Sequence, residues 1–434
     1  MTLQTRLNGS GDRPPAAPDR LADVRGTIRR SCVLRLGPSL AALEATPAVL
    51  LERVGEIADE ELAAAGVRVT DEERSLLHRR IADDVLGYGP IEPFLRDPAV
   101  TEVMVNGPGR IYVERDGRIE ETDAVFADEE HLLRVISKIV SNIGRRVDES
   151  SPMVDARLPD GSRVNAVLPP VALSGPTLTI RKFAGSILAA DDLVDLGTLS
   201  ASCAEFLRLC VRGKLNVLVS GGTGVGKTTL LNVLSGFISH AERIVTIEDA
   251  AELQLRQRHV VSLEYRPANA EGRGEIAIRD LVRNALRMRP DRIIVGEVRG
   301  AETLDMLQAM NTGHEGSLTT IHANSPRDAL ARLETLVLTA GVELPHRAIR
   351  EQIASAFDVI VQVGRLVDGT RRVVDVSEVL RLESDVVALQ QLYVARPPAS
   401  GSGLLGPLQA TGLRPHFAEK AAAAGVTFPP ELYS

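Results

Sequence analysis

The stretch that decides the fold is LNVLVSGGTGVGKTTLLNVLSGFI, residues 215–238. An apolar run, LNVLVS, leads into a glycine-rich turn, and a segment with a helical pattern follows it. The turn fits G-x-x-x-x-G-K-[ST] at every fixed position, between a buried strand and a helix. This arrangement points successive backbone N–H groups at a polyphosphate, and only glycine lets the backbone wrap so closely. We therefore predict a P-loop that binds ATP and Mg²⁺, rather than a glycine-rich turn with a chance lysine.

The turn supplies most of the predicted nucleotide contacts. Lys227 is expected to reach the β- and γ-phosphates, and the hydroxyl of Thr228 to bind Mg²⁺. The full set of predicted contacts from this turn is Gly221, Gly222, Thr223, Gly224, Val225, Gly226, Lys227, Thr228 and Thr229.

Carboxylates follow two further apolar strands. RIVTIEDAAEL, residues 243–253, contains Glu248, Asp249 and Glu252, and DRIIVGE ends at Glu297. Carboxylates beside a nucleotide and Mg²⁺ can hold metal-bound waters and polarise an attacking one. We predict that Glu248 and Glu297 serve the metal with Thr228. Acids gathered at a helix N-terminus for its dipole, or surface glutamates at strand ends, are the alternatives.

A polar segment, NTGHEGSLTTIHANSP, occupies residues 311–326 and contains His314 and His322. It lies one helix beyond the strand that ends at Glu297. Loops at the carboxyl ends of parallel strands gather at one edge of a sheet, where ligands bind. We therefore predict that the hydroxyls, amides and both histidines border the phosphates. A polar loop that caps the next helix from Asn324 or Ser325 is an alternative that could hold at the same time.

Composition narrows the class of protein. A chain of 434 residues is too long for one ordinary core, and 44% hydrophobic with 25% charged residues is typical of globular proteins. A net charge of −8, 3% aromatic residues and no tryptophan argue against a nucleic-acid partner. The arginine-dense segment 279–299 has an apolar helical face, so its arginines are expected on a solvated face or a subunit interface.

Cysteine usage and the absence of long apolar runs predict the compartment. Cys32, Cys203 and Cys210 are too few and too widely spaced for a disulfide framework or a four-cysteine zinc site. No apolar run approaches the roughly 20 residues that span a bilayer, and the N-terminus lacks the apolar core of a signal peptide. We expect a cytoplasmic protein whose membrane association is peripheral and through partners only.

Changes of periodicity along the chain predict its domains. The expected fold class is α/β, a P-loop domain with a parallel sheet, a smaller mixed α/β N-terminal domain and a helical N-terminal extension. The resemblance described next implies that the P-loop domain is a RecA-like ATPase domain. The predicted segments are a mobile tail (1–26), the helical extension (27–96), the mixed α/β (PAS-like) domain (97–184), a linker (185–194), the ATPase domain (195–390), and a linker with a small helical C-terminal tail (391–434).

Four motifs in a fixed order resemble the motor ATPases of type II secretion, type IV pili and type IV secretion. That superfamily carries a P-loop, an acidic box, a Walker-B strand ending Gly-Glu and a histidine box. Within it, the segments GYGPIEPFL and LRMRPDRIIVGEVRG are similar in sequence to the CpaF/TadA branch, which serves tight-adherence pili. The absence of a four-cysteine site fits that branch. The four motifs here are GGTGVGKT, TIEDAAEL, IIVGEVRG and TGHEGSLTTIHANSP.

The resemblance implies roles for individual residues. By position, Lys227 and Thr228 contact phosphate, Glu252 activates water, and Glu297 is the Walker-B glutamate. His322 is the principal histidine of the histidine box and His314 a second histidine of this branch. Lys227, Glu252, Glu297 and His322 are the catalytic residues that this implies. The superfamily also brings arginines from its N-terminal domain to the nucleotide, and the candidates here are Arg157, Arg163 and Arg181.

The resemblance further implies a homo-hexamer at the cytoplasmic face of the inner membrane. It would hydrolyse ATP against an inner-membrane platform protein and so power assembly of a pilus or secretion machine. A type IV secretion ATPase, a RecA-like nucleic-acid translocase and a nucleotide-binding scaffold with little hydrolysis are the alternatives.

Overall fold

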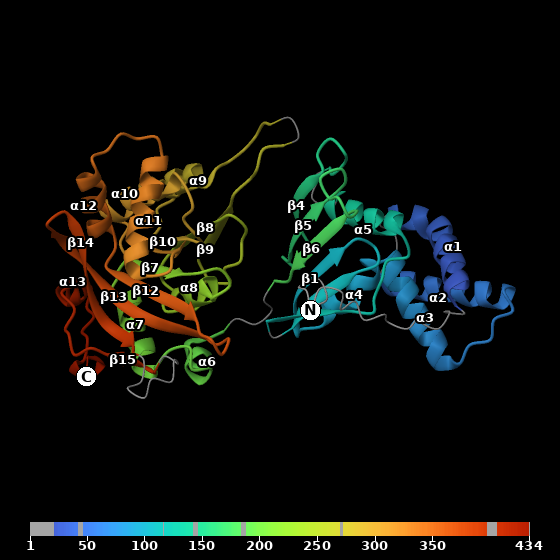
Figure 1. Ribbon diagram of the computed structural model, residues 1–434, viewed down its shortest axis with the longest axis horizontal. Helices are drawn as coiled ribbons and strands as arrows, with labels where there is room; N and C mark the ends of the chain where they lie inside the picture. Colours follow the sequence, from blue (N-terminus) through green and yellow to red (C-terminus); the bar gives the residue numbers. More distant parts are fainter. Residues whose placement is uncertain are drawn as a thin grey trace, which may run out of the picture. The chain divides into compact units, whose positions relative to one another are not determined.

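The computed structural model describes residues 21–41, 47–115, 117–141, 146–183, 188–269, 272–396 and 406–433 of the chain. The chain forms two compact units, Met1–Lys182 and Phe183–Ser434 (Figure 1). Most of the predicted mobile tail lies outside the described residues. Its last part is helical, because α1 begins at Ala22.

The first unit opens with three helices, α1 (Ala22–Ala41), α2 (Pro47–Ala64) and α3 (Asp71–Val85). A capping box, formed by Thr70 and Glu73, begins α3. The Thr70 hydroxyl accepts from the Glu73 N–H, and the Glu73 carboxylate accepts from the Thr70 N–H, so two end groups of the backbone are satisfied. The helices enclose a core of Ile28, Cys32, Leu36, Val54, Ile57, Ala58, Leu62, Leu77, Ile81 and Ala82.

A six-stranded antiparallel sheet forms the rest of this unit, in the order β3-β2-β1-β6-β5-β4. One face packs against α5, and the alternate side chains of each strand lie on the other face. The elements are η2 (Gly89–Ile91), α4 (Glu92–Arg96), β1 (Val100–Asn106), β2 (Ile111–Arg115), β3 (Arg118–Glu121), α5 (Glu129–Ser141), β4 (Met153–Arg157), β5 (Arg163–Val167) and β6 (Thr177–Arg181).

The helical extension and the mixed α/β region belong to one unit, although the sequence suggested a division near residue 96. The Lys138 ammonium on α5 donates to the carbonyls of Leu86 and Gly87, at 2.8 and 2.9 Å. Those carbonyls follow the end of α3, where backbone acceptors have no partner within the helix. Arg29 on α1 lies 3.1 Å from the His131 ring on α5. These contacts join the two regions.

The second unit contains a nine-stranded sheet in the order β15-β14-β13-β12-β7-β11-β10-β8-β9. The strands from β12 to β9 are parallel, and β13, β14 and β15 extend the sheet in antiparallel pairing. The elements are α6 (Ala190–Asp195), α7 (Ala201–Arg212), β7 (Val217–Gly221), α8 (Lys227–Ser235), β8 (Ile244–Glu248), β9 (Val260–Glu264), α9 (Ile278–Ala285), β10 (Arg292–Val295), α10 (Glu302–Asn311), β11 (Leu318–His322), α11 (Pro326–Thr339), α12 (His346–Ala356), β12 (Val359–Arg365), β13 (Arg371–Glu383), β14 (Val386–Ala395), β15 (Leu408–Ala410), α13 (Ala418–Ala423) and η3 (Pro430–Leu432).

Helices cover both faces of the parallel part of this sheet (Figure 1). One face packs against α7 and α8, and the other against α9 to α12. The central strand β7 is buried along its whole length, which explains why its sequence is an uninterrupted apolar run.

The predicted linker and C-terminal tail belong in part to the core of this unit. Helix α6 begins at Ala190, inside the predicted linker, and its Leu193 is buried against α7; residues 184–187 lie outside the described residues. At the other end, β14 runs to Ala395 and pairs with β15. Phe417 and Phe428 pack on Phe206 of α7, with ring centroids 6.2 and 5.2 Å away. The sequence missed this because the apolar face that needs covering lies about 200 positions earlier in the chain.

All three cysteines are buried thiols without a disulfide partner, as their spacing predicts. Burial raises the pKa of Cys32 to about 11, so this thiol stays protonated and unreactive. Among the described residues, no helix combines the length and the apolar character needed to cross a membrane.

Candidate nucleotide-binding site

The predicted P-loop forms the turn between β7 and α8. Gly224 and Gly226 have φ angles of +70° and +93°, a region that side chains disfavour. A Cβ atom on Gly221 would lie 2.6 Å from the Val363 carbonyl oxygen, so no side chain fits there. Gly226 caps α8 without a side-chain partner, which leaves the first N–H groups of the helix available for an anion.

Lys227, at the first position of α8, is only 7% exposed. Its ammonium donates to the Gly222 carbonyl at 2.8 Å and lies 3.1 Å from Nδ1 of His322. Nε2 of His322 lies 3.1 Å from Oε1 of Glu297. The structure thus joins three of the predicted catalytic residues in one continuous chain of contacts, Lys227 to His322 to Glu297.

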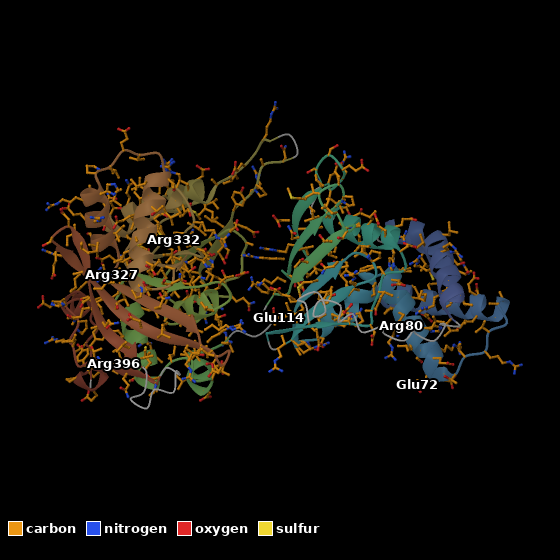
Figure 2. The ribbon with its side chains drawn as sticks, viewed as in Figure 1. Glu72, Arg80, Glu114, Arg327, Arg332 and Arg396 are labelled. Atoms are coloured by element: carbon orange, nitrogen blue, oxygen red, sulfur yellow. The ribbon has the colours of Figure 1, made fainter. Side chains whose placement is uncertain are left out.

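The tautomer of His322 follows from these contacts. Burial lowers the pKa of His322, and the charges of Lys227, Arg299 and Arg332 lower it further, against the raising effect of Glu297. Arg332 lies on α11 and is labelled in Figure 2. A neutral ring that carries its proton on Nε2 can accept from Lys227 and donate to Glu297 together.

Arg299 contacts two of the acidic residues, Glu297 and Asp249, and the sequence predicted no role for it. Its guanidinium contacts both carboxylate oxygens of Glu297 at 3.1 Å and donates to Oδ2 of Asp249 at 3.2 Å. The hydrogen bond to Glu297 raises the pKa of Arg299, with further contributions from Asp249 and Glu252. The position of Arg299, two residues after the Walker-B glutamate, was the only feature of the sequence that could have suggested a role in the site. That position does not show which acidic residues the arginine contacts.

Glu248 and Glu252 differ in position, and the metal role predicted for Glu248 stays a prediction. Glu248 is 3% exposed, and its Oε2 accepts from the N–H groups of Glu252 and Leu253, at 2.8 and 3.0 Å. Through Oε2, this buried carboxylate positions the loop that carries Glu252. Glu252 is partly exposed on that loop and is the better placed to act on water.

The centre of the polar segment 311–326 is a strand, and turns lie on both sides of it. Residues 318–322 form β11, which lies between β7 and β10 in the centre of the sheet. Thr319 and Thr320 are buried, and the Thr320 hydroxyl donates to the Gly296 carbonyl at 2.8 Å. Ser325 caps α11 by accepting from the Asp328 N–H, as the alternative interpretation predicts.

The two histidines of this segment lie at opposite edges of the sheet. His322 ends β11 and pairs with Gly221 at the start of the P-loop, whereas His314 precedes the strand. With a rise of about 3.3 Å per residue, the four steps from Leu318 to His322 span about 13 Å. His314 therefore lies at the edge away from the start of the P-loop, and its contact with a nucleotide stays a prediction.

The three candidate arginines of the first unit lie side by side. Arg157 pairs with Arg163, and Arg163 with Arg181, at one register across β4, β5 and β6. They share the sheet face that lies opposite α5, and Arg181 continues the row to Glu102 at 3.5 Å. Like charges placed directly opposite each other destabilise a sheet, so a strip of this kind suits an anionic partner. That these arginines contact a nucleotide stays a prediction.

The residues at the P-loop fit a nucleotide with Mg²⁺. The left-handed glycines and the open N-terminus of α8 form a cradle for phosphate, and Thr228 lies in the first turn of that helix. In the described ranges, no group of three or more His, Cys, Asp or Glu side chains could hold a metal ion. Mg²⁺ in such sites commonly keeps waters and binds substrate phosphates, so a hydroxyl with one nearby carboxylate is sufficient.

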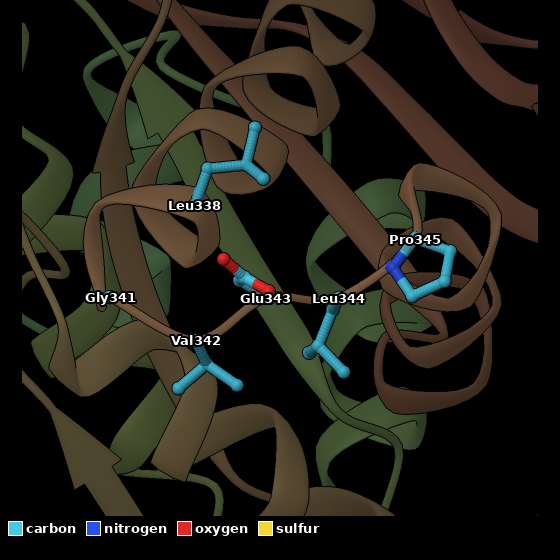
Figure 3. Close-up of a pocket in the computed structure, with 6 residues that line it drawn as sticks. All are labelled: Leu338, Gly341, Val342, Glu343, Leu344 and Pro345. Atoms are coloured by element: carbon cyan, nitrogen blue, oxygen red, sulfur yellow. The ribbon is translucent and has the colours of Figure 1, made fainter.

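A groove of the unit lies elsewhere, between α11 and α12 (Figure 3). Helix α11 begins just after β11 at the P-loop edge, and its 14 residues extend about 21 Å. The groove at its far end therefore does not belong to the nucleotide site. Its lining is Leu338, Gly341, Val342, Glu343, Leu344 and Pro345.

ATP binding is expected to weaken as the pH rises above about 8. Burial lowers the pKa of Lys227 to about 8, although Glu297 opposes this shift. Lys227 then loses its charge above that pH in the free protein, whereas bound phosphates favour the charged form. We expect ATP affinity to fall up to about tenfold per pH unit above 8, with uptake of one proton on binding. Isothermal titration in buffers of different ionisation enthalpy measures both.

The matched control for this prediction is Lys227→Arg, whose guanidinium stays charged throughout this range. It should take up no proton between pH 8 and 9. Proton uptake by neither protein would contradict the lowered pKa of Lys227.

Comparison with known proteins identifies the family. Residues 84–394 match the family described as Type II/IV secretion system protein. A Mycobacterium tuberculosis candidate conjugal transfer protein is 40% identical over 324 residues, covering 73% of this chain and 92% of its own length. The type IV secretion system protein PtlH of Bordetella pertussis is 38% identical over 316 residues, covering 66% and 92%.

A solved structure agrees with the fold class predicted from the sequence. The pilus retraction motor PilT with bound ADP has a TM-score of 0.50 at 23% identity, covering 69% of this chain and 80% of that one. At this identity the likeness shows a shared fold only. The family match extends over most of the chain and includes all four motifs. The chain belongs to the type II/IV secretion system protein family.

Proposed function

We propose that this protein is an Mg²⁺-dependent ATPase that powers assembly of a pilus or secretion machine at the cytoplasmic face of the inner membrane. The observation that carries the proposal is the contact chain from Lys227 through His322 to Glu297 at the mouth of the P-loop. Lys227 and Glu297, which are 70 positions apart in the chain, each lie within hydrogen-bond distance of His322, which supports the roles proposed for them.

The residues have distinct tasks in this proposal. The N–H groups of the P-loop bind the phosphates, and Lys227 exchanges the Gly222 carbonyl for a phosphate oxygen. Bound Mg²⁺ supplies neutralisation of the negative charge on the β- and γ-phosphates. Glu252 accepts the proton of the attacking water. His322 contacts both Lys227 and Glu297. A movement of the Lys227 ammonium toward phosphate therefore changes the position of the histidine and its contact with Glu297.

The machine that it serves has two candidates. The sequences of the motifs favour a tight-adherence pilus of the CpaF/TadA type with an inner-membrane platform protein. A type IV secretion machine is the second candidate, because PtlH and TrbB of Rhizobium radiobacter, 36% identical over 294 residues, are named for type IV secretion and conjugal transfer. Membrane proteins captured together with this chain distinguish the two.

The active form is expected to be a homo-hexameric ring. The number six comes from the resemblance to the secretion motors, and a repeated head-to-tail contact closes into a ring when its rotation permits.

Light scattering with and without a non-hydrolysable ATP analogue measures the assembly. The rate per chain should rise with protein concentration as the ring forms. A strict monomer with concentration-independent turnover would reduce the protein to a simple nucleotide hydrolase, and stimulation by DNA would favour the translocase.

A further inference from the structure

The hairpin between β12 and β13 extends beside the P-loop. Strand β12 pairs in parallel with β7, and Val363 lies opposite Gly221. The last two residues of β12 therefore extend past the start of the P-loop. Strand β13 returns antiparallel and brings Arg371 directly opposite Arg365. A short turn closes the hairpin, in which the Leu366 N–H donates to the Thr370 carbonyl at 2.8 Å.

Strand alternation shows which face these arginines occupy. Val363 and Val373 are buried in the same core as Val225 of the P-loop and the apolar side of α8. Side chains two positions apart on a strand share a face. Arg365 and Arg371 therefore lie on the sheet face that α8 and the P-loop cover.

Arg371 lies close to the loop itself. Its Cδ atom is 3.8 Å from the position that a Cβ atom on Gly226 would take. Gly226 immediately precedes Lys227 and caps the helix whose first N–H groups bind phosphate. Because the guanidinium group extends beyond Cδ, it can reach an anion seated on this part of the loop.

Two arginines of the hairpin, Arg365 and Arg371, are the charges that concern the nucleotide site. Within the described part of the chain, neither Arg365 nor Arg371 makes an ion pair or a side-chain hydrogen bond, although they face each other across the hairpin. Like charges in that position destabilise a strand pair. Arg299 on the other side of the P-loop is engaged by Glu297 and Asp249. Two unengaged cations beside a phosphate cradle suit an anionic ligand.

We propose that Arg371 binds the α- and β-phosphates of the nucleotide from within the same chain, with Arg365 adding to the positive potential. This inference rests on the proposed nucleotide site. The strand order decides which phosphates are involved. His322 and Glu297 follow β11 and β10 on one side of β7, whereas β12 lies on the other side. The hairpin therefore meets the phosphates that lie away from the γ-phosphate contacts, and it serves ADP and ATP alike.

The test is a comparison of nucleotide affinities for Arg371→Ala, measured by competition against a fluorescent ADP analogue. We expect ADP and ATP each to bind about tenfold more weakly, with the loss shrinking as salt is added. The kcat at saturating ATP should stay within about twofold, because the contact is equal in ground and transition states. Arg381→Ala, an exposed change farther along the same strand, is the matched control and should bind as the unchanged protein does.

Three outcomes overturn the inference in distinguishable ways. If Arg371→Ala binds both nucleotides normally while Lys227→Ala loses affinity, the hairpin is not part of the site but the P-loop stands. If ATP alone is weakened, the arginine meets the γ-phosphate and the assignment to the α- and β-phosphates is wrong. If Lys227→Ala also binds and hydrolyses normally, the proposed function fails and the inference fails with it. Circular-dichroism melting of each variant verifies that it is folded.

Discussion

Lys227→Ala is expected to lower the rate of phosphate release by a factor of about 1,000 or more. The ammonium is buried, and it contacts the Gly222 carbonyl and the His322 ring at the mouth of the loop. Removing it leaves the γ-phosphate without its principal cation in a site with little access to water, where an electrostatic contact is strong. Phosphate release at saturating ATP and Mg²⁺, at equal protein concentration, measures the effect.

The control for Lys227→Ala is Arg381→Ala, which removes a cation from the same unit at an exposed position. It should hydrolyse ATP at the rate of the unchanged protein. Equal rates for Lys227→Ala and the unchanged protein would rule out the P-loop assignment, because the γ-phosphate would then not depend on this charge.

Glu252→Gln should bind ATP normally and hydrolyse it about 100- to 1,000-fold more slowly. The Glu248 carboxylate holds the loop through the backbone amides of Glu252 and Leu253. An amide at position 252 therefore leaves the loop in place and removes only the group that can accept a proton. Nucleotide affinity and single-turnover rate, measured on the same preparation, separate the two effects.

Asp249→Asn is the matched comparison, because Asp249 lies on the same loop and its assigned contact is with Arg299. It should slow turnover much less than Glu252→Gln does. Normal hydrolysis by Glu252→Gln would transfer the role of base to Glu297, which lies next to His322 at 3.1 Å.

Local sequence determined much of the fold. The P-loop could be recognised because its glycines, lysine and threonine are fixed by backbone conformation within eight residues. The apolar strands β7, β8 and β10 were predicted for the same reason, and the capping box of α3 is equally local. Each is specified by periodicity or by turn chemistry, which depends only on neighbouring residues.

The assignment of acids and histidines needed the tertiary structure. His314 and His322 lie eight positions apart in one polar segment, and the polar pattern by itself predicted the same place beside the phosphates for both. The pairing of β11 with β7 places His322 next to Gly221, while the direction of the strand places His314 at the opposite edge. Glu248 and Glu252 were likewise separated by depth, because the strand end that carries Glu248 is buried.

Three further arrangements came only from pairing between distant strands. Register aligned Arg157, Arg163 and Arg181 in one row. The position of β12 beside β7 brought Arg371 to the P-loop from 145 positions further along the chain than Gly226. The apolar face of α7 brought the C-terminal aromatic residues into the core. Local patterns define an element and its buried face. The free energy of burial over the whole unit selects which elements become neighbours and in what register, and those choices placed the charges around the nucleotide site.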